Sequence, residues 1–544
     1  MLNRTKYCVA LFLLISLVGF SQQPHGAKYE IEDADEHFKH NNFVMALPIY
    51  KEFLKKDKNN PKLLLRTGQC YLNTNYNRTE AIVCFEALVK QDKDKIDDES
   101  WFLMGRAYHL GGRIEDAIKA FEKYKELFPK KAEVANRYIA MCNSARTLMD
   151  NPVNVSFTNM GKEINSDEPD YYPFVSGDET FMAFTSRRKD NIGGKKVEVD
   201  GYHPSDIYYS HVENGKWVKA IDAGAGMNGP LDEEVVGLKS DGQEMMVYID
   251  HIDKFGDLYL STRKANGDFQ KPKPLPAEVN SKIETSGGFG PDGNVIVFAR
   301  REKVDAKSDI YMSRKLPNGV WGVAYKLPPE VNSSENEDFP FLSTDGVTLY
   351  FSSEGHNTMG GYDLFKSTWN PDANTWTKAE NLGFPINSTD NERSISLTPD
   401  NRVGYISAFR PGGQGDLDIY RLRFNDNDQV VRFITGKVWL NDTLVKERKP
   451  PYANIIAKNK DNNKEYHFTP HSKTGKFLMA LDAGTYHVVV HCEGFTDVVE
   501  DFVISDIGDK TTEPEKVHNY ILKEKFPKAG QVESLKDDKK KKPK

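Results

Sequence analysis

The sequence predicts a multidomain chain of mixed α and all-β class, with a helical solenoid over 27–149, a five-bladed β-propeller over 153–425 and a β-sandwich over 432–524. Three observations predict it. The first segment has helical periodicity in repeats of about 35 residues. In the second, one unit of roughly 50 residues recurs five times. The third alternates short β-rich runs with Gly turns.

The central repeat has three fixed landmarks. Each copy opens with an apolar residue and Asn, continues to an Asp turn, and closes on Asp-Ile/Leu-Tyr/Phe. The opening residues are Asn165, Asn228, Asn280, Asn332 and Asn387, the turn residues are Asp178, Asp241, Asp292, Asp345 and Asp400, and the closing residues are Asp206, Asp257, Asp309, Asp363 and Asp418. The closing residues lie 51, 52, 54 and 55 positions apart. A period of this size indicates a radial or linear repeat.

Each copy is expected to fold as strands. Apolar and aromatic runs such as Val295–Phe298 and Thr348–Phe351 follow the Asp turns. Roughly four short strands in a unit of this length make one propeller blade. Five blades close into a ring and leave no exposed sheet edge. Val153, Val155 and Phe157 alternate with polar residues, so we expect this strand to join the last blade and close the ring.

The order of Asp-Gly turn, aromatic strand and Asp-Ile/Leu-Tyr resembles the PD40 or TolB-like propeller repeat, over about half of the chain. This resemblance implies an architecture but not a function, because propellers host many functions. We expect the closing Asp residues to accept hydrogen bonds from turn amides rather than to bind a metal ion.

Residues 27–149 resemble the tetratricopeptide repeat. Small and aromatic residues mark the third copy most clearly, at Trp101, Gly105, Tyr108, Ala117 and Phe121. The resemblance implies a concave groove for an extended peptide or a partner helix, lined by Asp35, Phe38, Lys39, Leu65, Gln69, Asn73, Phe102, Arg106 and His109. The alternative is a solvated spacer surface. Residues 132–148 are expected to form a capping helix.

If the blades are equivalent, the positions nine residues after each turn Asp share one face of the propeller. They are Arg187, Asp250, Arg301, Glu354 and Phe409, with Arg410 next. Their mixed signs do not suit a single anionic ligand. We therefore expect a protein-contact face, with mutual ion pairs as the alternative.

The first blade carries an insertion over 188–204, which is either a contact loop or disordered. Four Cys residues lie beyond residue 21, and their spacing fits no metal site. A Cys70–Cys84 disulfide is one possibility, and two separate buried thiols are the favoured one.

Both ends of the chain have a distinct composition. Arg4 and Lys6 precede an apolar run over 8–18. In Gly19-Phe20-Ser21, small residues stand at the −3 and −1 positions of a cleavage site after Ser21. Residues 1–21 are therefore expected to be a signal peptide. The last segment, 525–544, is rich in Lys and is expected to be disordered. It could meet anionic lipid or an acidic partner, or simply aid solubility.

Residues 432–524 contain Gly-Lys-Phe and Gly-Thr-Tyr turns and resemble the carboxypeptidase regulatory-like domain, a transthyretin-like sandwich. The chain has no His-Glu-x-x-His, no Gly-x-Ser-x-Gly and no phosphate-binding Gly-Lys-Ser/Thr loop. Lys and Arg number 73 against 80 Asp and Glu, a formal charge of −7, which argues against nucleic acid as a partner. We expect the protein to have no enzymatic activity and to bind no cofactor or metal ion.

This order of modules resembles periplasmic OmpA-family proteins related to PorE, which are linked to type IX secretion and gliding. Those proteins end in an OmpA-like domain that grips peptidoglycan. The sequence stops before such a domain, so no peptidoglycan-binding residues are carried over and contact with peptidoglycan stays an open question. The resemblance implies a scaffold in the periplasm at the outer membrane, bound to a β-barrel of the PorP/SprF type or to secretion components. A module that binds glycan or peptide on the propeller face is the alternative.

Overall fold

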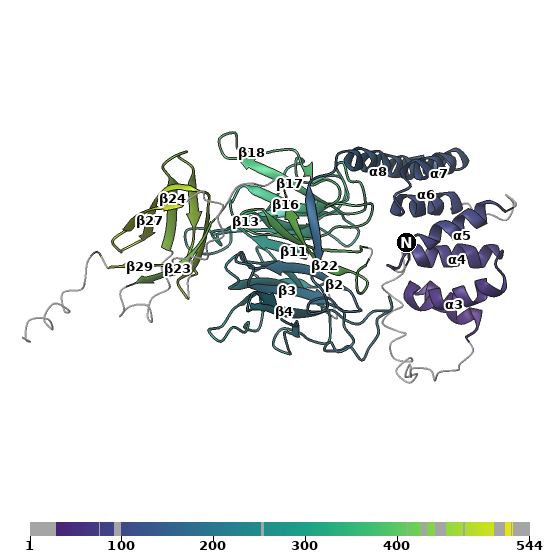
Figure 1. Ribbon diagram of the computed structural model, residues 1–544, viewed down its shortest axis with the longest axis horizontal. Coiled ribbons are helices and arrows are strands. Elements are labelled where there is room, and N and C mark those ends of the chain that lie inside the picture. Colours follow the sequence, from purple (N-terminus) through teal and green to yellow (C-terminus); the bar gives the residue numbers. More distant parts are fainter. Residues whose placement is uncertain are drawn as a thin grey trace, which may run out of the picture.

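The computed structural model describes residues 29–75, 77–91, 99–251, 255–410, 412–425, 432–440, 453–471, 474–504, 517–523 and 525. The expected signal peptide and nearly all of the Lys-rich tail lie outside these ranges. The three predicted regions follow one another in space, with the helical region at one end, the large all-β region in the middle and the C-terminal β region at the other end (Figure 1).

The N-terminal region is a stack of antiparallel helices. They are α2 (Ile31–Lys39), α3 (Phe43–Lys56), α4 (Pro61–Leu72), α5 (Glu80–Val89), α6 (Ser100–Leu110), α7 (Ile114–Leu127) and α8 (Ala132–Asp150), with a short 3-10 turn η2 (Pro129–Lys131). Asn42 and Asn60 cap α3 and α4, because their side chains accept hydrogen bonds from Met45 and Leu63 amides at 3.1 and 3.2 Å. The predicted capping helix is α8.

Two glycines let the helices of a pair approach closely. A Cβ on Gly68 would lie 2.7 Å from the ring of Phe85, and one on Gly105 would lie 2.6 Å from the ring of Phe121. Both rings are fully buried. The small and aromatic positions of the repeat therefore pack against each other, as the sequence predicts.

Residues 155–424 form five antiparallel sheets, which together we call the β-ring. The first holds β2 (Asp170–Val175), β3 (Phe181–Ser186), β4 (Asp206–Glu213), β5 (Lys216–Trp217) and β6 (Ile221–Asp222). The second holds β7 (Glu233–Leu238), β8 (Glu244–Ile249), β9 (Asp257–Thr262) and β10 (Lys273–Pro274). The third holds β11 (Ile283–Phe289), β12 (Val295–Arg301), β13 (Ser308–Arg314) and β14 (Tyr325–Lys326). The fourth holds β15 (Glu337–Leu342), β16 (Thr348–Ser353), β17 (Asp363–Asn370), β18 (Thr375–Trp376) and β19 (Glu380–Asn381). The fifth holds β20 (Ile395–Leu397), β21 (Val403–Ala408), β22 (Asp418–Phe424) and β1 (Val155–Asn159).

The ring is closed by a strand from its own N-terminus. The inner strands β2, β7, β11 and β15 lie side by side in that order, and β2 also contacts β20 and β21 of the fifth sheet. Strand β1 pairs with β22 in antiparallel register from Val155 opposite Phe424 to Asn159 opposite Tyr420. The prediction that the alternating strand after the helices joins the last sheet is confirmed.

The C-terminal region consists of two sheets packed around one apolar core. One sheet has the order β26 (Lys476–Leu481), β23 (Arg432–Leu440), β29 (His518–Leu522). The other has the order β25 (Glu465–Phe468), β24 (Ala453–Asn459), β27 (Gly484–Cys492), β28 (Val498–Ile504). Side chains such as Ile455, Met479 and Val488 fill the space between them. We call this region the C-terminal sandwich.

All four described cysteines, Cys70, Cys84, Cys142 and Cys492, are free and buried. Burial raises the pKa of Cys70 and of Cys84 to about 12. The favoured prediction of separate buried thiols is confirmed, and the Cys70–Cys84 disulfide is absent.

Candidate functional site

The helical region docks on one face of the β-ring. His109, at the end of α6, hydrogen-bonds through Nε2 to the carbonyl oxygen of Met359 at 2.9 Å, and Met359 lies in the apolar core of the helices. Nearby, the Thr389 hydroxyl donates to the carbonyl oxygen of Leu110 at 3.4 Å. Loops of the fourth and fifth sheets therefore complete the helical core.

An arginine strengthens this interface. Arg78, between α4 and α5, forms an ion pair with Asp390, and its guanidinium group lies 5.6 Å from the ring centre of Phe409. The neighbouring Asn75 hydrogen-bonds to Asp416. Arg78 and Asp390 are both about four-fifths buried, at 18% and 22% side-chain exposure, so solvent screens this pair little.

A second arginine contacts the ring from α8. Arg137 forms an ion pair with Glu335 at 3.2 Å and donates to the carbonyl oxygen of Glu354 at 3.3 Å. These contacts lie beside the Met359 loop, so the interface reaches from α4 to α8.

The burial of His109 has an electrostatic consequence. Loss of solvent lowers its pKa to about 4; the hydrogen bond to Met359 opposes this shift, and nearby Arg106 adds to it. His109 is therefore neutral at pH 7, and its place is within the chain's own interface rather than in an open groove.

The insertion in the first sheet also takes part in internal contacts. Its Glu198 and Asp200 form ion pairs with Arg187 at 2.6 and 2.7 Å, and its Tyr202 hydroxyl donates to Asp416. A Cβ on Gly201 would meet the side chain of Asn42 at the start of α3. The insertion is thus a contact loop between the ring and the helices.

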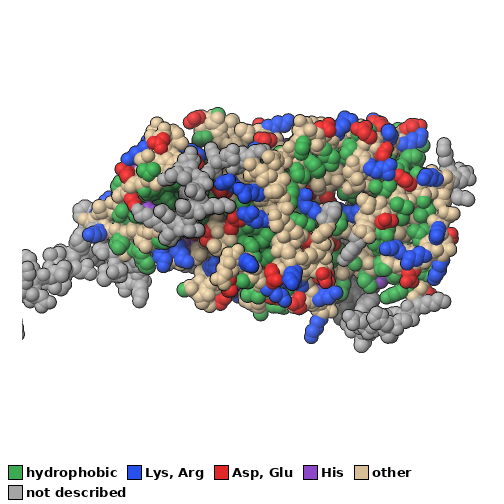
Figure 2. All heavy atoms as spheres, viewed as in Figure 1, with side chains coloured by type: hydrophobic (Ala, Val, Ile, Leu, Met, Phe, Trp, Pro, Cys, Tyr) green, Lys and Arg blue, Asp and Glu red, His purple; other side chains and the backbone are tan. Residues whose placement is uncertain are grey.

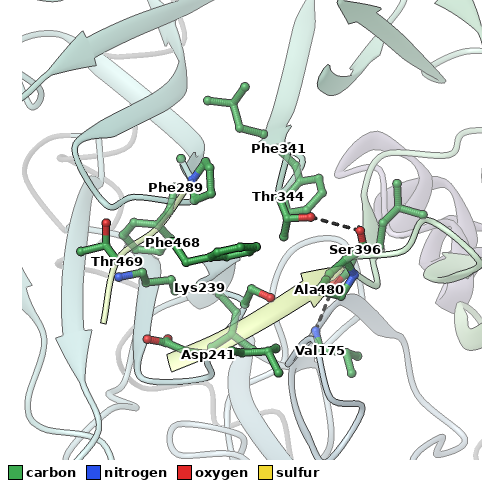
Figure 3. Close-up of a pocket in the computed structure, with 18 of the residues that line it drawn as sticks. Val175, Lys239, Asp241, Phe289, Phe341, Thr344, Ser396, Phe468, Thr469 and Ala480 are labelled. Carbon is green, nitrogen blue, oxygen red and sulfur yellow. Dashed lines mark hydrogen bonds between the residues drawn. The ribbon is translucent and has the colours of Figure 1, made fainter. Parts of the chain in front are cut away.

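The C-terminal sandwich covers the opposite face of the ring. Phe468 of the sandwich points into an opening lined by all five sheets, with Phe289 and Phe341 among its neighbours (Figure 3). Leu478 and Ala480 of β26 pack beside it. The remaining cavity has a volume of about 60 Å³, which holds a few water molecules but no organic ligand.

The inner strands also meet across the ring. The rings of Tyr172, in the first sheet, and Phe339, in the fourth, lie 4.1 Å apart between centroids. Beside them, the Tyr171 hydroxyl donates to Glu234 at 3.1 Å, and Arg393 lies over the ring of Tyr362 at 4.3 Å. Burial and the charge of Asp232 raise the pKa of Glu234 to about 7.

One groove on the helices remains open. It lies at the first repeat, has a volume of about 440 Å³, and is lined by Asp35, Phe38, Lys39, Asn41, Lys62 and Arg66. Arg66 lies 4.1 Å over the ring of Phe38, and Lys62 forms an ion pair with Asp35 at 2.7 Å. Burial raises the pKa of Asp35, but hydrogen bonds from Lys62 and Tyr50 outweigh it and hold the pKa below its usual value. This groove contains Asp35, Phe38 and Lys39 of the predicted set.

The other predicted groove residues lie elsewhere on the helices. Gln69 accepts from Arg66 at 3.2 Å at the edge of the groove, while Asn73 donates to the Gln69 carbonyl oxygen and ends α4. Phe102 packs between α6, α7 and α8, with its ring 5.0 Å from that of Tyr138. Arg106 is partly exposed beside His109.

The predicted ring-face residues have mostly internal partners. Arg187 pairs with the insertion, as described above, and Asp250 accepts from Tyr248 at 3.4 Å. The Glu354 carboxylate accepts from Asn336 at 2.5 Å, and Phe409 lies under Arg78. Arg410 turns away to the Phe157 ring at 3.7 Å and the Pro385 carbonyl oxygen at 2.7 Å. Arg301 is partly exposed. The geometry favours mutual contacts on this face.

Within the described ranges, no cluster of three or more His, Cys, Asp or Glu side chains could hold a metal ion. The helices of the same ranges include none with the length and apolar character needed to span a bilayer. On the visible face of the molecule, acidic and basic side chains are interspersed rather than gathered by sign (Figure 2). That face shows no basic stripe of the kind that binds nucleic acid.

Comparison with known proteins identifies the class of the helical region. The tetratricopeptide repeat family model matches residues 62–94 and 99–131. These matches cover α4 to α7, so these four helices form tetratricopeptide repeats. No curated protein matches the chain.

Several solved structures are similar to about half of this chain. A putative TolB from Agrobacterium tumefaciens is 14% identical, with a TM-score of 0.27, and the match covers 50% of this chain and 97% of that one. An endo-arabinase from Bacteroides thetaiotaomicron is 14% identical with a TM-score of 0.32, covering 49% and 96%. A glycoside hydrolase is 9% identical with a TM-score of 0.35, covering 51% and 94%.

Sequence reasoning did not identify Arg78, Arg137 or Met359 as interface residues. They lie between repeat landmarks, in a helix-connecting loop, in the capping helix and in a ring loop. The repeat pattern marks only positions shared by all copies, whereas an interface between two different repeats uses positions that differ from copy to copy.

Proposed function

We propose that this chain is a non-enzymatic scaffold that binds a protein partner in the groove of its first tetratricopeptide repeat. The observation that carries the proposal is that this groove stays open, while the third repeat is packed on the β-ring through His109. Tetratricopeptide repeats use concave surfaces for binding.

The groove indicates the chemistry of its partner. Three of its six lining residues, Lys39, Lys62 and Arg66, are basic, and Asp35 is the one acid. Asp35 is already paired with Lys62, and Lys39 is paired with Glu36 at 3.6 Å. Arg66 donates only to the neutral Gln69 side chain, so it is the cation best placed to receive an incoming carboxylate. The Phe38 ring offers an apolar surface beneath Arg66. A segment with acidic residues beside an apolar side chain fits best.

The proposal includes the setting that the sequence implies. The chain is exported by its signal peptide to the periplasm and is associated with the outer membrane and type IX secretion, where a β-barrel of the PorP/SprF type is the partner. We interpret the five sheets as the blades of a TolB-like propeller and the C-terminal sandwich as a transthyretin-like domain. The module order supports this setting.

Affinity capture from crosslinked envelopes of the native host tests the proposal. Wild-type protein should recover an outer-membrane barrel or secretion component, and Arg66→Glu should recover at least about tenfold less, since it places a like charge before an acidic partner. Arg146→Glu, on the exposed side of α8, is the matched control and should behave as wild type. Equal recovery by Arg66→Glu and wild type would exclude the groove as the binding site. Recovery of no envelope protein would exclude the proposed scaffold function.

A further inference from the structure

A second cavity lies between the β-ring and the C-terminal sandwich, beside the opening into which Phe468 points. Its volume is about 590 Å³, within the range of roughly 300–1,000 Å³ that small-molecule sites occupy. Its two walls come from different domains, and domain junctions are a common place for such sites.

The sandwich wall is the outer face of the sheet β26-β23-β29. Lys437 and Trp439 stand on this face of β23, with Asn519 and Ile521 opposite them on β29. Trp439 is 48% exposed and Ile521 is 61% exposed. The Lys437 Nζ lies over the Trp439 ring, 5.3 Å from its centre. This wall presents an open indole flanked by a cation and an amide.

The ring wall is polar and incompletely paired. Arg263 lies 4.3 Å over the Phe181 ring, and its Nε donates to the Gly267 carbonyl oxygen at 2.7 Å. Asp178 and Asp241 each use one carboxylate oxygen for a turn amide. Among the described residues, no hydrogen bond engages the two terminal nitrogens of Arg263 or the second oxygen of either carboxylate.

These walls together select a ligand class. A saccharide presents a C–H face that packs on the negative face of an indole, and its hydroxyl groups both donate and accept, as the mixture of Arg263, Asp178 and Asn519 requires. Lys437, Lys476 and Arg263 outnumber Asp178 and Asp241 around the cavity. The excess of one positive charge favours a ligand that carries a carboxylate.

We propose that the cavity between the β-ring and the C-terminal sandwich is a binding site for an acidic oligosaccharide, with Trp439 as the stacking platform and Arg263 and Lys437 as the carboxylate contacts. This site is separate from the groove of the first repeat, so either proposal can fail without the other.

A glycan array carrying uronate- and sialate-bearing oligosaccharides, their neutral counterparts and acidic peptides tests this assignment on the full chain. Wild-type protein should retain at least one acidic oligosaccharide over its neutral counterpart. Calorimetry with that oligosaccharide should show a loss of affinity of about tenfold or more for Trp439→Ala and for Lys437→Glu. Lys458→Glu, an exposed lysine on β24 outside the cavity, is the matched control and should bind as wild type.

Thermal melting of each variant separates loss of binding from loss of fold, since Trp439 and Lys437 are surface residues of a sheet that keeps its core. Retention of no acidic oligosaccharide by wild type would overturn the proposal. Retention of acidic peptides alone, or binding by Trp439→Ala equal to that of wild type, would overturn it as well.

Discussion

The opening Asn of each repeat joins neighbouring parts of the ring through a pair of hydrogen bonds. Its side-chain oxygen accepts from, and its side-chain nitrogen donates to, the backbone of one residue in a third strand. The pairs are Asn165 with Ile419, Asn228 with Ile207, Asn280 with Leu258, Asn332 with Ile310 and Asn387 with Leu364. Because Asn165 bonds to Ile419 of the fifth sheet, it also closes the ring.

Replacement of one such Asn should be costly. In Asn332→Ala, the Ile310 amide and the Leu327 carbonyl oxygen lose the Asn332 side chain as partner, whereas the Ile310 carbonyl oxygen keeps the Leu327 amide. Each buried unpaired group costs about 1–3 kcal/mol. We expect the free energy of unfolding to fall by about 3 kcal/mol, measured by chemical denaturation. Asn318→Ala, at an exposed turn, should change it by less than about 1 kcal/mol. Equal effects of the two substitutions would contradict the role of the paired bonds.

His109 makes the docked state sensitive to pH. Its pKa is about 4 in the folded chain and about 6.5 when exposed. The unfolded or undocked chain therefore binds more protons between these values, so stability rises with pH across this window and is lost as pH falls from about 6.5 to 4. The shift corresponds to at most about 3 kcal/mol. Melting curves of wild type should show this slope, and His109→Asn should reduce it. An unchanged slope would contradict the assignment.

The closing Asp residues show how far sequence reasoning reaches at this scale. The expectation that they accept turn amides is confirmed at Asp206, Asp363 and Asp418, which accept from Ile192, Met359 and Gln414 at 2.6–2.7 Å. Asp309 instead pairs with Lys326 at 2.7 Å. A shared residue type fixes the strand position, but the local loop decides its partner.

Among the single elements, strand β1 closes the β-ring. It precedes the ring in sequence yet supplies the outer strand of the last sheet. Its Phe157 is half-buried against the apolar cluster of the fourth and fifth sheets, and Arg410 lies over its ring. The alternation of apolar and polar residues was enough to predict the strand, because one face had to be buried.

Loss of the Phe157 ring should loosen this closure. We expect Phe157→Ala to lower the free energy of unfolding by about 2–3 kcal/mol, somewhat less than a fully buried Phe, for which the cost is about 3–5 kcal/mol. Thr158→Ala, on the exposed side of β1, should cost less than about 0.5 kcal/mol. Urea denaturation measures both. If Phe157→Ala matched Thr158→Ala, the strand would not be holding the ring.

The helix pairs were predictable for a related reason. Gly68 with Phe85 and Gly105 with Phe121 recur at nearly the same spacing, 17 and 16 residues, because each pair must fit a large ring against a bare backbone. The cavity residues Trp439 and Arg263 have no such repeated signal. They line one cavity only because two regions far apart in the sequence pack together, which single-sequence patterns do not encode.

For the whole molecule, the domain order was evident from sequence, whereas the docking was not. The helical groove and the ring face were predicted as two separate partner surfaces. The second and third repeats instead contact the ring through Arg78, which lies over Phe409, and through His109. Intramolecular contact supplies an effective concentration that a free partner cannot match. Among the described residues, the groove of the first repeat stays open, and it is the surface that we propose for a partner.

Small-angle X-ray scattering of the full chain tests this arrangement most directly. Wild type should scatter as one elongated body with the helices docked, and Arg78→Glu should increase the radius of gyration, because it places a carboxylate against Asp390 and Asp416. Arg146→Glu, away from the interface, should scatter as wild type. A wild-type curve that fits only separated domains, or an Arg78→Glu curve that overlays wild type, would contradict the docked arrangement.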